Sequence, residues 1–146
     1  MIEYKTGNLL DSTCECLVNT VNTVGVMGKG LALCFKTAFP EMFKAYQYEC
    51  ERNYIEAGTI CVWRASESLI ILNAATKGHW KNPSKYIWIW RILHDMNYYI
   101  EVYNIQSVAI PHLGCGNGGL DKSKVKRMIE LAHELFWQKI KIELYE

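Results

Sequence analysis

The segment from Leu17 to Phe39 constrains the fold more than any other part of the sequence. It starts with a mostly apolar run from Leu17 to Val21, which predicts a buried strand. A turn segment with three glycines follows, and apolar residues then recur at helical spacing. A strand that leads through glycines into a helix presents free backbone N–H groups, which can bind phosphate. The segment therefore predicts an α/β unit with an anion site, although a tight connection without a ligand has the same pattern.

The rest of the chain alternates between strand and helix patterns. Expected strands cover residues 2–5, 59–64, 68–74, 107–110 and 140–145. Expected helices cover residues 30–39, a segment that starts at Pro40, a segment capped by Asn82 with Pro83 as its first residue, and a last segment with an apolar stripe from Val125 to Phe136. This alternation predicts an α/β fold of three layers, α/β/α, around a mixed and mostly parallel sheet, in one domain over residues 1–146.

Composition limits the classes of partner. Sixteen basic and 15 acidic residues give a net charge of +1, so any contact with nucleic acid has to be local. The six cysteines form no C-x-x-C pair and no zinc spacing, so we expect reduced thiols, no metal ion and no cofactor. The sequence has no signal-peptide pattern and no apolar run long enough for a bilayer. We therefore expect a cytoplasmic monomer without a membrane partner.

Three loops contain residue types that a simple connection between a strand and a helix does not require. They cover residues 22–30, 73–82 and 111–121, and each follows a buried strand. In open α/β sheets, ligands bind beyond the carboxyl ends of the strands. The three loops therefore predict one composite site. Asn22 opens the first loop, and its amide can both donate and accept a hydrogen bond, which suits the diol of a ribose.

Glycines in the third loop match a nucleotide-binding pattern. Residues 114–119 read G-x-G-x-x-G after a strand and before a helix, and Glu143 stands at the distance of a ribose-binding acid. A dinucleotide fold would need a second half after this unit, which the remaining sequence does not supply. A second glycine loop that grips the same phosphates as the first is the more economical interpretation. The phosphate loop of nucleotide hydrolases is excluded, because Gly30 replaces the hydroxyl residue after Lys29.

Lys77 is the strongest single candidate for a catalytic residue. It follows a buried strand and the small residues Ala74 and Ala75. A lysine is ordinarily protonated, with a pKa of about 10.4. Partial burial would lower this pKa and free an amine for covalent catalysis. A solvated loop lysine has the same sequence pattern. Asp121 has a similar double interpretation, as a plain helix N-cap or as the acid beside a catalytic lysine.

The Lys77 loop also contains aromatic and basic residues. Trp80 lies outside the helical stripe that follows and can stack on a base, which is worth about 1–3 kcal/mol. Lys81 is placed to meet phosphate, though surface lysines are common. His79 and His112 can act as acid or base, or serve as ordinary hydrogen-bonding loop residues.

Together these motifs resemble the macro domain, the ADP-ribose-binding α/β/α module. The likeness rests on Gly7-Asn8-Leu9-Leu10, on the segment from Leu17 to Leu31, and on Pro111-His-Leu-Gly-Cys-Gly116. The first loop and Ala75-Thr-Lys-Gly-His-Trp80 are similar to DarG-type DNA ADP-ribosyl glycohydrolases, antitoxins that remove ADP-ribose from thymidine in DNA. The Thr76-Lys77 pair is also similar to the lysine-dependent terminal ADP-ribose glycohydrolases.

The resemblance implies a role for each loop. Asn8 would accept a hydrogen bond from the adenine. The family usually has Asp at this position, so the hydrogen bond here would lack the contribution of a charged acceptor. The implied catalytic residues are Lys77, Asn22 and Asp121. His79, Trp80 and Lys81 would contact the base or the DNA. The implied ADP-ribose-binding residues are Asn8, Leu9, Thr20, Asn22, Gly25, Val26, Met27, Gly28, Lys29, Gly30, Leu31, Thr76, Leu113, Gly114, Cys115, Gly116, Asn117 and Gly118.

Three functions fit this sequence. The first is removal of ADP-ribose from thymidine bases of single-stranded DNA, which reverses a DNA ADP-ribosyltransferase toxin that would be the cognate partner. The second is the same chemistry on ADP-ribosylated Glu or Asp in proteins. The third is an ADP-ribose reader without hydrolysis, in which Lys77 is only a surface residue. Both glycine loops serve all three functions, so they do not separate them.

Overall fold

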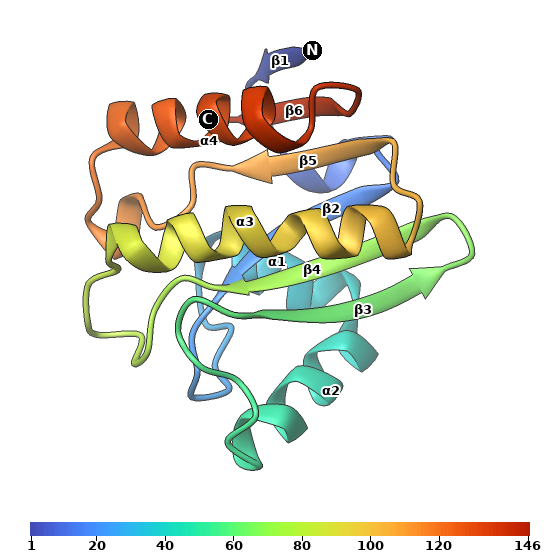
Figure 1. Ribbon diagram of the computed structural model, residues 1–146. Helices are drawn as coiled ribbons and strands as arrows, with labels where there is room; N and C mark the ends of the chain where they lie inside the picture. Colours follow the sequence, from blue (N-terminus) through green and yellow to red (C-terminus); the bar gives the residue numbers. More distant parts are fainter.

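Six strands form one sheet in the computed structural model, which describes residues 1–146. The strands are β1 (Ile2–Lys5), β2 (Cys16–Val21), β3 (Ile60–Ser66), β4 (Leu69–Ala75), β5 (Ser107–Pro111) and β6 (Lys141–Tyr145). Their order is β1-β6-β5-β2-β4-β3, and every neighbouring pair is parallel except β3 with β4. The carboxyl ends of β2, β4 and β5 therefore meet at one edge, at the left of Figure 1.

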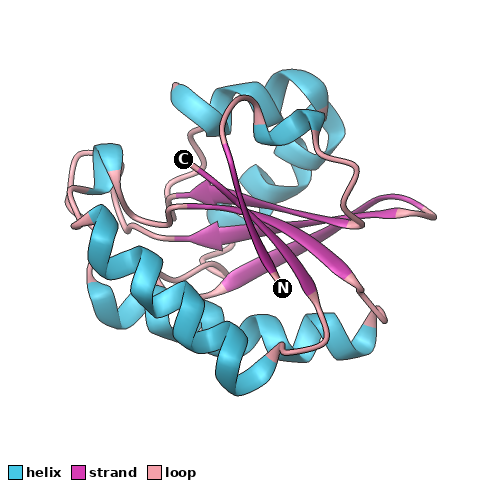
Figure 2. Ribbon diagram, turned by 90° about the horizontal axis from the view of Figure 1, so that it is seen from above, coloured by secondary structure: helices cyan, strands magenta, loops and turns pink.

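Helices cover both faces of the sheet (Figure 2). They are α1 (Gly30–Ala38), α2 (Pro40–Glu51), α3 (Tyr86–Val102) and α4 (Lys122–Phe136), with two short 3-10 turns at Leu9–Asp11 and Gly116–Gly118. Side chains of β2 alternate between the faces, with Val18 in the core under α3 and α4, and Leu17 and Val21 in the core under α1 and α2. The expected three-layer fold is confirmed.

Two expectations about helices were wrong. The third helix begins at Tyr86, so Asn82 and Pro83 are not its cap and first residue. The backbone N–H of Ser84 instead donates to the Gly118 carbonyl at 2.9 Å, which ties this segment across to the loop after β5. In α4, Val125, Ile129 and Ala132 are buried and Met128 and Phe136 pack partly buried against the same core, but Leu135, which lies within the expected apolar stripe, is exposed. No helix in the structure combines the length and apolarity that crossing a bilayer requires.

Candidate functional site

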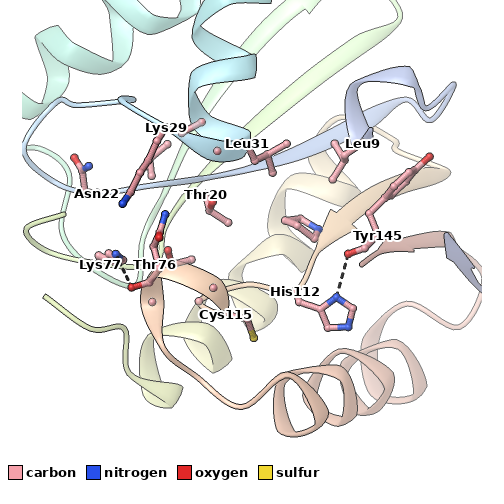
Figure 3. A pocket seen from close by; sticks show the side chains of 18 of the residues that line it. Leu9, Thr20, Asn22, Lys29, Leu31, Thr76, Lys77, His112, Cys115 and Tyr145 are labelled. Atoms are coloured by element: carbon pink, nitrogen blue, oxygen red, sulfur yellow. Dashed lines mark hydrogen bonds between the residues drawn. The ribbon is translucent and has the colours of Figure 1, made fainter. Parts of the chain in front are cut away.

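The loops after β2, β4 and β5 surround a cavity of about 790 Å³ (Figure 3). We call them the first glycine loop (residues 22–31), the lysine loop (residues 76–85) and the second glycine loop (residues 113–118). The volume is in the range of ordinary small-molecule sites. The predicted binding residues that line the cavity are Asn8, Leu9, Thr20, Asn22, Val26, Gly28, Lys29, Gly30, Leu31, Thr76, Gly114, Cys115, Gly116, Asn117 and Gly118.

Asn22 shapes the first glycine loop with its side chain. Its Oδ1 accepts from the N–H groups of Val24 (3.1 Å) and Val26 (3.3 Å) and from the Tyr46 hydroxyl (2.8 Å). Its Nδ2 donates to the Val26 carbonyl at 2.8 Å. The amide oxygen is therefore occupied within the protein, and only the second Nδ2 hydrogen remains for a ligand. Asn22 thus holds the loop in shape, a role that its sequence position alone did not indicate.

Two of the predicted binding residues in this loop face away from the cavity. Met27 is 1% exposed, and its Sδ lies 3.8 Å from Nδ2 of the buried Asn19 on β2. Gly25 backs onto α2, where an added Cβ would meet Gln47 at 3.4 Å. Neither residue lines the cavity. They anchor the loop to the layer beneath it.

The first glycine loop ends at the start of α1, which opens on the cavity. Lys29 is the N-cap, and its side chain makes no capping bond. Gly30 has a φ of +61°, and Gly30, Leu31 and Ala32 all line the cavity. The first amides of a helix have no intrahelical partner, so they are available to an anion. This geometry matches the anion site that the sequence predicted.

The second glycine loop lies opposite and is tightly packed. Gly114 has a φ of +75°, and an added Cβ would lie 2.8 Å from Cδ1 of Leu120. A Cβ on Gly118 would lie 2.5 Å from the buried Ser84 Oγ. Leu113 is fully buried and does not line the cavity. Glycines at 114 and 118 therefore let this loop pass close to the lysine loop.

Lys77 crosses the gap between these loops. Its Nζ donates to the carbonyls of Trp80 at 3.1 Å and of Asn117 at 3.0 Å, and no carboxylate pairs with it. Burial and the nearby charge of Lys29 lower the pKa of the Lys77 amine. In Figure 3, the Lys29 side chain points toward Lys77 across the mouth of the cavity. The lysine is thus held at the wall rather than in free solvent.

Three predicted site residues lie outside the cavity wall. The Asp121 carboxylate caps α4 by accepting from the Lys124 N–H at 3.1 Å, so the N-cap interpretation accounts for it. The His79 ring lies 4.9 Å from that of Trp80, and its Nδ1 accepts from the Lys81 N–H. Lys81 is exposed beside the mouth. Trp80 does line the cavity and remains 46% exposed.

At its far end, the cavity is closed by residues that the sequence did not single out as binding residues. His112 and Tyr145 line it beside Leu9, and His112 Nδ1 lies 3.0 Å from the Tyr145 carbonyl. Burial lowers the pKa of His112. Asn8 lines the same end, but its Oδ1 already accepts from the Leu10 N–H at 3.0 Å. The other lining residues that were missed are Gly7, Val21, Ala32, Pro111, Lys122 and Glu146.

Nearby acidic groups serve the framework. Glu143, which the glycine pattern suggested as a ribose-binding acid, does not line the cavity. Its carboxylate accepts from Ser12 Oγ at 2.7 Å and the Tyr145 hydroxyl at 3.1 Å. No group of three or more His, Cys, Asp or Glu side chains is placed to hold a metal ion. The polar side chains that line the cavity are lysines, amides and threonines, together with His112 and Glu146 at the far end.

Two glycine loops over the carboxyl edge of an α/β/α sheet define a class of ADP-ribose-binding module, the macro domain. Residues 18–129 match the macro domain family, and the chain belongs to that family. The DNA ADP-ribosyl glycohydrolase of Mycobacterium tuberculosis is 46% identical over 92% of this chain and 39% of that protein. The protein of the same name from Thermus aquaticus is 42% identical over 100% of this chain and 41% of that protein.

Solved structures give the same relationship. The macrodomain of Mycobacterium tuberculosis DarG has a TM-score of 0.94 at 43% identity, covering 99% of this chain and 97% of that one. Thermosipho africanus DarTG in complex with ADP-ribose has a TM-score of 0.86 at 32% identity, covering 97% of this chain and 41% of that one. The chain spans about two fifths of the length of the curated relatives it matches.

Proposed function

We propose that this domain removes ADP-ribose from thymidine bases of single-stranded DNA, in a reaction that depends on Lys77. Relatives more than 40% identical over nearly the whole chain bear the name DNA ADP-ribosyl glycohydrolase. A Thermosipho africanus relative is named as a fusion of a DNA ADP-ribosyl transferase with a DNA ADP-ribosyl glycohydrolase. These names support a substrate that is made by a DNA ADP-ribosyltransferase toxin and reversed here.

The observation that carries the proposal is the setting of the Lys77 amine. Two backbone carbonyls accept its hydrogens, its pKa is lowered, and no carboxylate holds it in the charged form. A neutral amine has two hydrogens, so these two bonds leave the lone pair free. A nucleophilic amine at the cavity wall is what covalent glycosyl transfer needs and what a reader does not need.

The two glycine loops supply the binding part of this mechanism. The free amides at the start of α1 and the backbone of residues 114–118 face each other across the cavity and would hold the diphosphate between them. Asn22 would offer its remaining amide hydrogen to the distal ribose. Uncharged amide groups of this kind can bind a diphosphate without a strongly basic surface, which agrees with the net charge of +1.

In the proposed chemical step, the neutral Lys77 amine attacks C1″ of the distal ribose. The new C1″–N bond forms as the bond from C1″ to the base breaks, the base takes the electron pair, and the proton that the Lys77 nitrogen gives up passes to the base. The enzyme-bound sugar is an amine adduct that opens to a transient imine. Water then adds at C1″, the amine of Lys77 leaves, and ADP-ribose is released. The net reaction is hydrolysis, and Lys77 is regenerated.

The test compares two substrates under the same conditions. One is a single-stranded oligonucleotide with ADP-ribosylated thymidine, and the other is a protein with ADP-ribosylated glutamate. We expect wild type to release ADP-ribose from the oligonucleotide, and Lys77→Ala to bind free ADP-ribose within a few fold of wild type without turnover.

Each other outcome has a definite meaning. Release from the protein alone would replace the proposed substrate with an acidic side chain. Binding of ADP-ribose without release from either substrate would make the domain a reader. Normal turnover by Lys77→Ala would rule out the lysine mechanism.

A further inference from the structure

Positive charge gathers on one side of the cavity mouth although the whole chain is nearly neutral. Residues 68–94 contain no Asp or Glu, and they hold Lys77, Lys81, Lys85 and Arg91. The start of α4 adds Lys122 and Lys124. The lysine loop leads directly into α3, and the starts of α3 and α4 lie at the same end of the molecule in Figure 1, where the Asp121 N–H donates to the Tyr86 hydroxyl at 3.0 Å. The two basic segments therefore form one surface.

We call this surface the basic-aromatic ridge. Its residues are Trp80, Lys81, Lys85, Tyr86, Lys122 and Lys124. The ridge is continuous with the site, because Trp80 and Lys122 line the cavity and the Trp80 carbonyl accepts from the Lys77 amine. The other members are exposed and extend away from the mouth over the starts of α3 and α4.

None of the ridge lysines has an acidic partner. The ion pairs in the structure involve other residues, such as Lys44 with Glu41 and Lys141 with Glu143. Surface lysines without carboxylates keep their charge available for a negatively charged partner. The neighbouring carboxylate of Asp121 caps α4 by accepting from the Lys124 backbone N–H and forms no ion pair with these lysines.

Aromatic rings stand beside these lysines. The Lys81 Nζ lies 5.1 Å from the centre of the Trp80 ring, and the Lys124 Nζ lies 5.7 Å from that of Tyr86. Trp80 is 46% exposed and Tyr86 is 36% exposed, so each ring retains an accessible surface. Lys85 lies in the same way over Trp88, at 5.1 Å. Two of the ridge lysines thus lie over a ring of the ridge itself, and a third lies over a neighbouring ring.

Exposed rings combined with unpaired cations are typical of surfaces that bind single-stranded nucleic acid. Bases stack on exposed rings, which is worth about 1–3 kcal/mol per base, while cations follow the phosphates. A base-paired strand keeps its bases stacked within the duplex, so rings placed this way favour a single strand. The diphosphate of ADP-ribose would lie inside the cavity between the glycine loops. The cations outside it are therefore free for phosphates of another part of the substrate.

We propose that the basic-aromatic ridge binds the nucleotides that flank the modified base, and so selects strand-linked over free ADP-ribosyl nucleoside. This inference rests on the proposed function and adds the path of the strand outside the cavity. Lys85 and Lys124 are the members to test first, because neither lines the cavity. Their loss should affect the strand and leave the ADP-ribose site intact.

The experiment uses the double variant Lys85→Ala/Lys124→Ala and two substrates, an ADP-ribosylated thymidine nucleoside and the same unit within a single-stranded oligonucleotide. We expect KM for the oligonucleotide to rise about tenfold. The slope of log KM against log salt concentration should fall by about 1.4, because each of the two lost phosphate contacts contributes ~0.7. Kinetics on the nucleoside should match wild type. The control is Lys36→Ala/Lys139→Ala, which removes the same charge elsewhere and should match wild type on both substrates.

A second measurement does not depend on catalysis. Anisotropy of a fluorescent, unmodified oligothymidylate should report binding to wild type and to the control variant, and about tenfold weaker binding to the ridge variant. Equal oligonucleotide binding and kinetics for ridge and control variants would overturn the inference, and so would equal losses on nucleoside and oligonucleotide. Failure of wild type to cleave either DNA substrate would instead contradict the proposed function itself.

Discussion

The first glycine loop and the lysine loop line the same cavity but are built in different ways. In the first, side chains turn inward: Asn22 and Met27 anchor the loop, and backbone amides face the cavity. In the lysine loop, backbone groups bond to neighbouring segments, as the Gly78 carbonyl does by accepting from the Thr23 N–H at 2.8 Å. The side chains of Lys77 and Trp80 are then presented to the cavity.

In the proposed mechanism, this difference between the two loops separates ligand binding from the chemical step. A ligand held by backbone amides depends on the shape of the loop, so changes in the first glycine loop should reduce affinity and stability together. A reaction carried by one amine depends on that side chain, so changes in the lysine loop should reduce turnover while the fold remains. Four variants test this separation.

Lys77→Arg should have the largest effect of the four variants, a loss of turnover. Arginine keeps the positive charge and can donate to the two carbonyls, but it does not deprotonate in proteins. If the neutral amine is the reactive form, turnover should fall at least about 10²-fold, the scale of a lost proton-transfer group, while ADP-ribose affinity stays within a few fold. Single-turnover release of ADP-ribose and calorimetric binding measure the two quantities. Substantial activity in this variant would mean that only charge is needed at this position.

Gly118→Ala should have the next largest effect. The new Cβ would lie 2.5 Å from Ser84 Oγ and 3.1 Å from Ser84 Cβ, so the second glycine loop and the lysine loop must separate. Overpacking of this kind costs about 1–3 kcal/mol of folding free energy, measured by denaturant unfolding. Adding Ser84→Gly removes both atoms and should restore most of the loss. Gly78→Ala is the control, because its Cβ meets nothing within 4 Å.

Tyr46→Phe tests the first glycine loop. The Tyr46 hydroxyl donates to both the Asn22 carbonyl and Asn22 Oδ1 at 2.8 Å, and the residue is fully buried. Its removal should cost about 1 kcal/mol of stability and weaken ADP-ribose binding. The rate of the chemical step at saturating substrate should stay near that of wild type. A large loss of that rate with unchanged affinity would contradict the division between the two loops.

Lys29→Met should have the smallest effect. It tests a link between the two loops, because Lys29 belongs to the first glycine loop and its charge acts on the Lys77 amine of the lysine loop. The charge of Lys29 contributes to the lowered pKa of Lys77, so its removal moves the pKa of Lys77 up toward the ordinary lysine value. A smaller fraction of Lys77 is then neutral at neutral pH. The turnover rate should fall a few fold there, and its rise with pH should move to higher pH. A pH–rate profile that does not move would remove Lys29 from the tuning of the amine.

Much of the fold could be predicted because the strands are apolar and bounded by glycine or polar turns. The strand expected from Leu17 to Val21 is the observed β2 but for its first residue, and the helix expected over 30–39 is α1 but for its last residue. The start of α3 was misplaced because Asn82-Pro83 is a good local helix start. A long-range bond from the Ser84 N–H to the Gly118 carbonyl holds that segment extended instead.

The candidate site could be located by its loops but not resolved into single side chains. A motif assigns consecutive residues together, whereas in a folded loop neighbouring side chains point in opposite directions. Gly25, Met27 and Leu113 were therefore grouped with their neighbours as binding residues, although these three do not line the cavity. Tyr145 was missed because nothing in a terminal apolar strand marks the residue that reaches a cavity formed by other loops.

The position of β6 has a consequence for the order of folding. Strand β1 pairs with β6 alone, and β6 lies between β1 and β5, so β1 joins the sheet only after the last strand has been placed. Tyr145, at the end of β6, also closes the far wall of the cavity. Contacts between segments so distant in sequence form slowly, because a long loop has to close first. During refolding, the capacity to bind ADP-ribose should therefore return after most of the helical structure has formed.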